Sequence, residues 1–313
     1  MKRANSLIKP KAIKKGDTIG IVATGAPLEE SRLQQGVKAI ESRGYKVKIP
    51  LSPSKYYASD AWSNGSVEER LEALNDLVND PEIRAIISAR GGYGTPQILP
   101  FIEIGRLIKN PKVMVGLSDF CPMLVYQSFF AGIASLHASS VGSSLADELS
   151  TAEAKADTDE LFEALSNSKF LPKHECLVIR ERKAKGPILA TNLSMLCFLL
   201  GTQFDIDLKG VILVLEDVGE SPFRVHRMLL QLQLAGKLDG LAGLVFGRFS
   251  KCEAKHGPTI EEVFEIFVKE NTNNYPVLKG LAMGHWGRNV PLPLGCQAEI
   301  SGRDLKILES AVS

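Results

Sequence analysis

The sequence predicts an α/β protein with two domains, a Rossmann-like N-terminal domain built on a parallel sheet and a mixed, barrel-like C-terminal α/β domain. Three observations predict this fold class. The chain has 313 residues, and a single hydrophobic core stops growing at about 250–300 residues. In the first half, continuous apolar segments alternate with amphipathic ones, which is typical of a parallel sheet covered by helices on both faces. In the second half, the apolar segments are spaced less regularly and end in a hairpin pattern.

The elements of the first half follow from apolar runs and helical periodicity. Leu33, Val37 and Ile40 recur at helical spacing, and Ser66 with Glu69 forms a capping-box pattern that opens a helix. The expected helices cover residues 29–42, 66–79 and 120–131. The expected strands cover residues 17–23, 45–49, 83–89 and 112–117.

The second half begins after a change in composition. A charged, alanine-rich helix is expected over residues 151–168, and a polar segment follows it. We therefore predict an N-terminal domain over 1–167, a linker over 168–185 and a C-terminal domain over 186–313. Ser221 and Pro222 are typical of the N-cap and first position of a helix, and Gly236 of its C-terminal end. Expected elements are helices at 193–200, 222–235 and 260–270 and strands at 211–215, 241–249, 278–283, 297–300 and 305–308.

The charge balance bears on the partners of the protein. Lys and Arg number 37 against 36 Asp and Glu, for a net charge of +1, so no broad field favours nucleic acid or an anionic membrane. No run of about 18 apolar residues is present to span a bilayer. The basic N-terminal stretch lacks the apolar core of a signal peptide. We therefore expect a cytoplasmic protein.

The cysteines and histidines predict neither a disulfide framework nor a metal site. The five cysteines are scattered and never form a Cys-x-x-Cys pair, which excludes the usual zinc spacing. His137, Glu148 and His226 offer no metal-ligand spacing either. No Walker or dinucleotide-binding fingerprint is present, and no cofactor is expected.

Ser118 is the first candidate catalytic residue. It follows the apolar run 113–117 and precedes a helix-like segment, and open α/β sheets place their chemistry at the carboxyl ends of strands. A serine on such a turn can present its hydroxyl as a nucleophile. The alternative is an ordinary helix N-cap, because the Gly-x-Ser-x-Gly pattern fails at Phe120.

A glycine-rich segment, Arg90-Gly91-Gly92-Tyr93-Gly94, follows the third expected strand. Glycines let backbone N–H groups approach an anion closely, so the segment can serve as an oxyanion hole or a carboxylate cradle. The alternative is a tight turn without chemical function. Arg90 can bind a terminal carboxylate with two hydrogen bonds or take part in a structural ion pair.

Glu216 and His285 complete a set that suffices for nucleophilic acyl transfer. Glu216 follows a buried strand and can orient a histidine, or it can simply complement the dipole of the next helix. His285 lies between Gly284 and Trp286, which suits a histidine on an exposed turn. The alternative is a hydrogen-bonded turn histidine, and His137 is a weaker second candidate.

Taken together, these segments resemble the serine L,D-carboxypeptidase family, which contains murein tetrapeptide carboxypeptidases and microcin C self-immunity peptidases. The resemblance runs nearly end to end, and its motifs occur in the family's order. They are the segments 15–23, 89–94, 116–119, 192–194, 201–202, 213–217 with Glu220, and 284–285.

The resemblance implies a catalytic triad of Ser118, Glu216 and His285 at a domain interface. It also implies an oxyanion hole from the backbone N–H groups of Gly92 and Asp119. The expected reaction releases terminal D-alanine from a murein tetrapeptide and passes through an acyl-enzyme. The resemblance also implies that the protein is a homodimer. Further candidates for substrate binding are Arg90, Gly91, Tyr93 and Trp286.

Several positions depart from the family pattern without removing a triad member. Cys121 stands three residues after the nucleophile, where the family usually has Thr or Ser. A family Gly-Gly-Asn segment is Ala190-Thr191-Asn192 here, which can narrow the cleft and alter the substrate.

Two other functions fit the same residues. A peptidase of the microcin-immunity type would use the same triad on an aminoacyl- or peptidyl-nucleotide amide, with Trp286 as a platform for the base; for Trp286 the alternative is core packing. A two-lobed protein that binds a small molecule would need no convergence of Ser118, Glu216 and His285.

Overall fold

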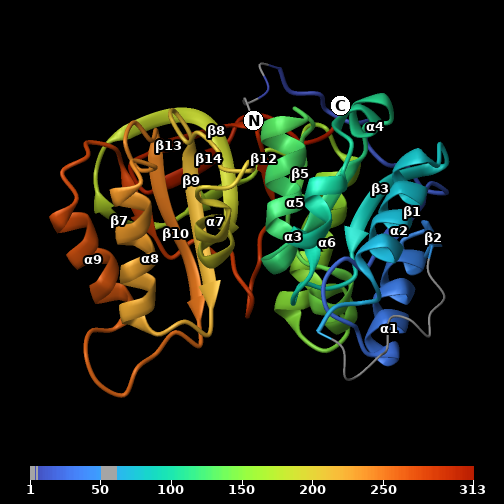
Figure 1. Cartoon of the computed structure of the whole chain (residues 1–313), viewed down its shortest axis with the longest axis horizontal. Helices are drawn as coiled ribbons and strands as arrows, with labels where there is room; N and C mark the ends of the chain where they lie inside the picture. The colour runs from blue at the N-terminus through green and yellow to red at the C-terminus, as the bar shows by residue number, and fades with distance from the viewer. Residues whose placement is uncertain (1–3, 5, 51–61) are drawn as a thin grey trace. The chain divides into compact units, whose positions relative to one another are not determined.

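The computed structural model describes residues 4, 6–50 and 62–313, and these form two compact units (Figure 1). The N-terminal unit comprises the described residues up to Phe170, together with Val290–Gly295 and Ser310–Ser313. The C-terminal unit comprises Leu171–Asn289 and Cys296–Glu309. Two late segments of the chain therefore belong to the N-terminal unit.

The N-terminal unit contains a largely parallel sheet. The described strands occur in the order β12-β5-β4-β3-β1-β2, and only β12 runs antiparallel to its neighbour. The order 2-1-3-4-5 is the flavodoxin-like arrangement, in which the carboxyl ends of the strands near the β1–β3 pair border the ligand crevice. The strands are β1 Thr18–Val22, β2 Lys46–Lys48, β3 Ile83–Ser88, β4 Val113–Gly116, β5 Ser135–His137 and β12 Leu292–Leu294.

Helices connect these strands. The chain passes from β1 outward to β2 and then back to β3, so right-handed crossovers put the intervening helices α1 and α2 on opposite faces of the sheet. The helices are α1 Glu30–Ser42, α2 Val67–Asn79, α3 Thr95–Ile98, α4 Ile104–Lys109, α5 Cys121–Val125 and α6 Ala152–Ser166. Shorter helical segments are η2 Leu99–Phe101, η3 Ser118–Phe120, η4 Tyr126–Phe130 and η5 Val141–Leu145.

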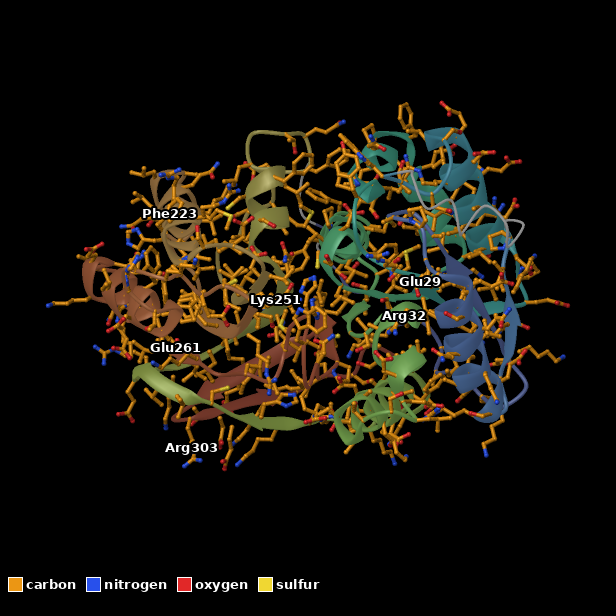
Figure 2. All side chains as sticks on the ribbon, turned by 90° about the horizontal axis from the view of Figure 1, so that it is seen from below. Glu29, Arg32, Phe223, Lys251, Glu261 and Arg303 are labelled. Carbon is orange, nitrogen blue, oxygen red and sulfur yellow. The ribbon has the colours of Figure 1, made fainter. Side chains whose placement is uncertain are left out.

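Local interactions explain where these helices begin and how they are held. The predicted capping box is confirmed, because Glu69 N donates to Ser66 Oγ at 3.2 Å and Ser66 N donates to Glu69 Oε2 at 3.0 Å. The single helix expected over 120–131 is instead η3, α5 and a π-helical turn, η4. Arg32, labelled in Figure 2, lies on α1. It donates to both carboxylate oxygens of Asp147, at 3.1 and 2.7 Å.

The C-terminal unit contains a mixed sheet that nearly closes on itself. Its strands lie in the order β6-β14-β13-β8-β9-β10-β11-β7. Only Cys176 separates β6 from β7, so the two edges of the sheet lie next to each other along the chain. The strands are β6 Lys173–Glu175, β7 Leu177–Arg180, β8 Lys183–Asn192, β9 Ile212–Val218, β10 Gly243–Ser250, β11 Val277–Lys279, β13 Gln297–Ser301 and β14 Asp304–Ile307.

The helices of this unit are α7 Leu193–Leu199, α8 Pro222–Leu234 and α9 Ile260–Glu270. Ser221 occupies the N-cap position of α8, but its side chain makes no capping hydrogen bond, unlike Thr259 at the start of α9. Residues 173–185, expected to be polar and connecting, form β6, β7 and the start of β8. β6 and β7 lie at the two edges of the sheet, where charged side chains are common, so the charged composition of this stretch did not predict strands.

The predicted fold class is confirmed, with a parallel sheet in the N-terminal unit and a mixed, barrel-like sheet in the C-terminal unit. No helix in the described part of the chain is long and apolar enough to cross a lipid bilayer.

Candidate active site

Ser118 lies on a strained turn directly after β4. Its φ is +59°, and among the described residues Lys251 is the only other non-glycine residue with positive φ. For residues other than glycine, such a conformation costs roughly 1–3 kcal/mol and persists where the surroundings enforce it. Ser118 is partly exposed, whereas Leu117 and Asp119 on either side are buried. The turn therefore presents the hydroxyl in the manner of a nucleophile elbow.

Gly91 lies against this turn in the N-terminal unit. A Cβ atom at Gly91 would lie 2.7 Å from Ser118 Cβ and 3.0 Å from Ser118 Oγ. The same atom would lie 3.4 Å from the backbone nitrogen of Asp119. Only glycine therefore lets the segment after β3 approach the serine and its following N–H group this closely.

Gly91→Ala is expected to lower the kcat of the reaction that Ser118 carries out by about 100-fold. The added methyl group displaces Ser118, and a misplacement of reacting atoms by about 1 Å lowers a rate by about this factor. Gly105→Ala in α4 is the matched control, since nothing lies within 4 Å of the added atom there. Steady-state kinetics of both variants checks the prediction. Equal losses in the two variants would show that the packing against Ser118 is not the cause.

The carboxylate of Asp119 fixes the glycine segment beside the serine. It accepts hydrogen bonds from the backbone N–H groups of Gly94 at 3.3 Å and Thr95 at 2.8 Å. Burial raises the pKa of Asp119, and the hydrogen bonds from Thr95 and Gly94 partly oppose this. Residues 91–95 and the Ser118 turn thus form one connected structure.

Arg70 supports the same segment from α2 and was not singled out from the sequence. It is 1% exposed and donates to the carbonyl oxygens of Gly94 at 2.7 Å and Thr24 at 2.9 Å. A third hydrogen bond, at 2.6 Å, joins it to Gln97 Oε1. Burial lowers the pKa of Arg70. A charged residue inside an amphipathic helix gave no sequence signal, because its acceptors Thr24, Gly94 and Gln97 lie at least 24 residues away in the chain.

The other candidates from the glycine segment are exposed or form the turn itself. Arg90 is exposed, and its Nη1 donates to the carbonyl oxygen of Pro27 at 2.9 Å. Tyr93 is 53% exposed and packs edge-on against Trp62. Gly92 has a φ of +103°, and an added Cβ there would clash with Ala26. Substrate binding by these residues remains a prediction.

Glu216 and His285 are paired within the C-terminal unit, although 69 residues separate them. Glu216 lies in β9 and is completely buried, and its Oε2 is 2.6 Å from His285 Nδ1. With the proton on Nδ1, the histidine donates to the carboxylate and its Nε2 becomes a proton acceptor. Nε2 has no hydrogen-bond partner among the described residues. This pair has the arrangement of a general base held by a carboxylate.

The pKa of His285 reflects two opposing effects. Burial of the ring alone would lower the pKa, but the charge of Glu216 and its hydrogen bond to the ring outweigh this and raise it. Glu216 therefore both orients the imidazole and stabilises its protonated form.

Asn192 and Asp217 hold Glu216 in place. Asn192 Nδ2 donates to Glu216 Oε1 at 3.2 Å and to Asp217 Oδ1 at 3.0 Å. Burial raises the pKa of Asp217 to about 6, and the nearby charge of Glu216 adds to this. Asn192 is also the N-cap of α7, where its Oδ1 accepts from Met195 N at 3.1 Å. This asparagine links the two carboxylates to a helix, a role that its place in the 192–194 motif did not indicate.

The remaining histidines lie elsewhere. His137 is buried in β5. His226, on α8, lies 3.7 Å from Glu270 of α9.

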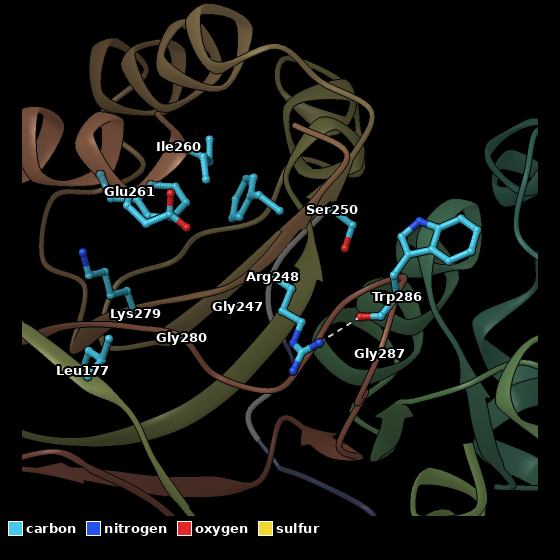
Figure 3. Close-up of a pocket in the computed structure, with 12 residues that line it drawn as sticks. Leu177, Gly247, Arg248, Ser250, Ile260, Glu261, Lys279, Gly280, Trp286 and Gly287 are labelled. Carbon is cyan, nitrogen blue, oxygen red and sulfur yellow. Dashed lines mark hydrogen bonds between the residues drawn. The ribbon is translucent and has the colours of Figure 1, made fainter. Parts of the chain in front are cut away.

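Trp286 is exposed rather than packed in a core. It is 54% exposed, and the ammonium of Lys251 lies 4.2 Å from the centre of its ring. Trp286 also borders a pocket of about 500 Å³ within the C-terminal unit (Figure 3). The core-packing alternative for this residue is therefore wrong, and a role in binding remains a prediction.

Comparison with known proteins identifies the family. Two family models match, the LD-carboxypeptidase N-terminal domain over residues 19–138 and the LD-carboxypeptidase C-terminal domain over residues 185–300. A probable murein peptide carboxypeptidase of Bacillus subtilis is 30% identical over 97% of this chain and 95% of its own. The chain belongs to the LD-carboxypeptidase family. The resemblance seen in the sequence is confirmed, and family membership supports a peptidase rather than a non-catalytic binding protein.

Solved structures of LD-carboxypeptidases and related proteins have the same fold. Muramoyltetrapeptide carboxypeptidase from Oxalobacter formigenes is 28% identical, with a TM-score of 0.83 over 93% of this chain and 98% of its own. The microcin C7 self-immunity protein MccF, solved with aspartyl sulfamoyl adenosine, has a TM-score of 0.89 over 98% of this chain and 100% of its own. At 22% identity, the second likeness concerns the fold alone.

Proposed function

We propose that this protein is a serine carboxypeptidase that removes the terminal D-alanine from murein tetrapeptides, with Ser118, His285 and Glu216 as its catalytic triad. The observation that carries the proposal is the buried hydrogen bond of 2.6 Å between Glu216 and His285 Nδ1, which leaves Nε2 available as a base. The murein substrate is supported by the relatives that are named for murein peptides.

In the proposed mechanism, His285 Nε2 takes the proton of Ser118 Oγ as the oxygen attacks the carbonyl carbon between the L-centre of diaminopimelate and D-alanine. The tetrahedral oxyanion is bound by the backbone N–H groups of Gly92 and Asp119. When the carbon–nitrogen bond breaks, the protonated His285 gives its proton to the leaving amine. A water molecule, activated by the same nitrogen, then hydrolyses the ester and frees Ser118.

This mechanism assigns the catalytic groups to two domains. The nucleophile and the oxyanion hole come from the predicted N-terminal domain, residues 1–167, and the base with its carboxylate comes from the C-terminal domain, residues 186–313. We further propose that the protein acts in the cytoplasm, where peptides from the cell wall would be recycled, and that it forms a homodimer. Light scattering at several protein concentrations tests the dimer.

Mass spectrometry of the products tests the proposed reaction. The protein is incubated with L-Ala-γ-D-Glu-mesoDAP-D-Ala, and we expect equal amounts of the tripeptide and free D-alanine. The Ser118→Ala variant should give neither product. Release of L-alanine in place of D-alanine, or an intact tetrapeptide after long incubation with the wild-type protein, would contradict the proposal.

A second substrate class deserves the same assay, because Trp286 is exposed. An indole with one free face can stack on a nucleobase, as a peptidase acting on aminoacyl-nucleotides requires. An aspartyl-nucleotide amide is therefore compared with the tetrapeptide at equal concentrations. We expect a higher kcat/KM for the tetrapeptide; a higher value for the nucleotide would favour the second function.

A further inference from the structure

Arg248, in β10, holds the segment that carries His285. Its backbone N–H donates to Met283 O at 2.7 Å, just before that segment. Its Nη1 donates to Trp286 O at 3.3 Å, just after His285 (Figure 3). The histidine is thus bracketed by two hydrogen bonds to one residue of the neighbouring strand.

Two glycines make room for this arginine. A Cβ atom at Gly284 would lie 2.9 Å from Arg248 Cβ, and one at Gly287 would overlap Arg248 Nη1. Both glycines have positive φ, at +158° and +69°. The backbone of residues 284–287 therefore packs closely around the arginine side chain. A change in the guanidinium would alter the position of His285.

The guanidinium also borders the pocket beside Trp286. Arg248 makes no ion pair with any described carboxylate, and one carbonyl bond leaves most of its five donors unused. The pocket has a volume of about 500 Å³, which is within the usual range for small ligands. Phe249 and Phe264, which are 8% and 3% exposed, form part of its wall. These rings can pack against the apolar part of a ligand, while the exposed side chain of Arg248 stays accessible to a charged group.

The other polar groups of the pocket lie on two sides. In Figure 3, Arg248 and Ser250 lie on the side of Trp286, and Glu261 and Lys279 lie on the opposite side. Lys279 is already paired with Glu265, at 2.7 Å. Glu261, in the first turn of α9, therefore stands as an acceptor across from Arg248. A ligand with a carboxylate at one end and N–H donors at the other, such as an acidic peptide, matches this arrangement.

We propose that this pocket binds a carboxylate-bearing part of the peptide substrate, remote from the bond that is cleaved, with the carboxylate on the guanidinium of Arg248. The proposal rests on the proposed function, because a peptide substrate supplies the ligand. Since the same guanidinium holds the His285 segment, Arg248 is both a specificity-determining and a positioning residue.

The test measures selectivity rather than absolute rate. Three tetrapeptides are compared: the parent, one with the α-carboxylate of D-glutamate amidated, and one with the free carboxylate of the diaminopimelate side chain amidated. We expect at least one amide to lower kcat/KM about tenfold with the wild-type protein, the usual effect of losing a hydrogen bond to a charged group. With Arg248→Gln this preference should vanish, and Arg248→Lys should restore part of it. A general loosening of the His285 segment lowers kcat/KM for all three peptides equally, so it leaves the ratio between the parent and each amidated peptide unchanged.

Lys269→Gln is the matched control, because it removes one exposed positive charge from α9 in the same unit. This variant should show the same ratio of kcat/KM between the parent and the amidated peptides as the wild-type protein. An unchanged ratio in Arg248→Gln would overturn the proposal. If the wild-type protein cleaves none of the peptides, the proposed function fails by itself. In that case, calorimetry measures the binding of the three peptides to the Ser118→Ala variant and to the Ser118→Ala, Arg248→Gln double variant. Weaker binding of the parent peptide to the double variant supports the proposed pocket. Equal affinities of the two variants for the parent peptide overturn it.

Discussion

Replacing Ser118 by alanine is expected to lower kcat on the murein tetrapeptide by about 10⁶-fold, the loss found when a serine protease loses its nucleophile. The turn that presents this side chain has a φ of +59°, and alanine leaves no nucleophilic oxygen at that position. The alanine variant should retain the fold. Single-turnover and steady-state assays of D-alanine release measure the effect.

The control for this variant is Ser42→Ala, which removes an exposed serine at the end of α1. It should retain wild-type activity. Thermal unfolding of both variants shows whether the fold is intact. A Ser118→Ala protein that is folded and still releases D-alanine at more than a small fraction of the wild-type rate would rule out covalent catalysis by this residue.

Replacing Glu216 by glutamine is expected to lower kcat/KM by about 10⁴-fold, because a neutral amide no longer holds the imidazole in the tautomer that leaves Nε2 free. The change also acts on the pH profile. Burial alone lowers the pKa of His285, and the charge of Glu216 with its hydrogen bond reverses this shift. Removing that charge should therefore lower the pKa.

The sign of the pH effect follows from the role of the base. His285 must be neutral to accept the proton of Ser118, so activity is lost as the pH falls through its pKa. In the wild-type protein, the acid limb of kcat/KM should have its midpoint above 6.5, the ordinary value for histidine. In Glu216→Gln the residual activity should show a midpoint below that of the wild type. An acid limb that does not move between the two proteins would mean that another group is being titrated.

Glu175→Gln serves as the matched control for charge removal. Glu175 pairs with Arg303 on the surface of the C-terminal unit, where the side chains are 58% and 66% exposed. Its loss should change neither the rate nor the midpoint of the acid limb.

The sequence predicted the elements that carry the site because each contains a local signal. An apolar run ends just before Ser118, and a similar run precedes Glu216, so both residues could be placed at strand ends. The pairing of Glu216 with His285 could not be worked out in this way, since it depends on how β9 and the 284–287 segment fold together. Only the order of the motifs, through the family resemblance, implied it.

Other features left no local signal. Arg70 is a buried residue whose partners Thr24, Gly94 and Gln97 lie far away in the chain, and periodicity does not indicate such partners. Asn192 and Asp217 lie in segments that carry the family resemblance, but the hydrogen bonds of Asn192 to Glu216 and Asp217 left no local signal. The return of Leu292–Leu294 to the sheet of the N-terminal unit is equally hidden, because three residues with a central proline do not specify which sheet they join.

The proposed triad requires Ser118 Oγ and His285 Nε2 to lie close together, and an experimental structure would measure the distance between these two atoms. A crystal structure of the protein with a phosphonate analogue of the tetrapeptide bound to the serine would measure it. We expect both atoms within reach of the reacting centre, and about 2.6–3.2 Å apart in the structure without the inhibitor. A separation too large for a hydrogen bond or a single bridging water, in both structures, would contradict the proposed triad.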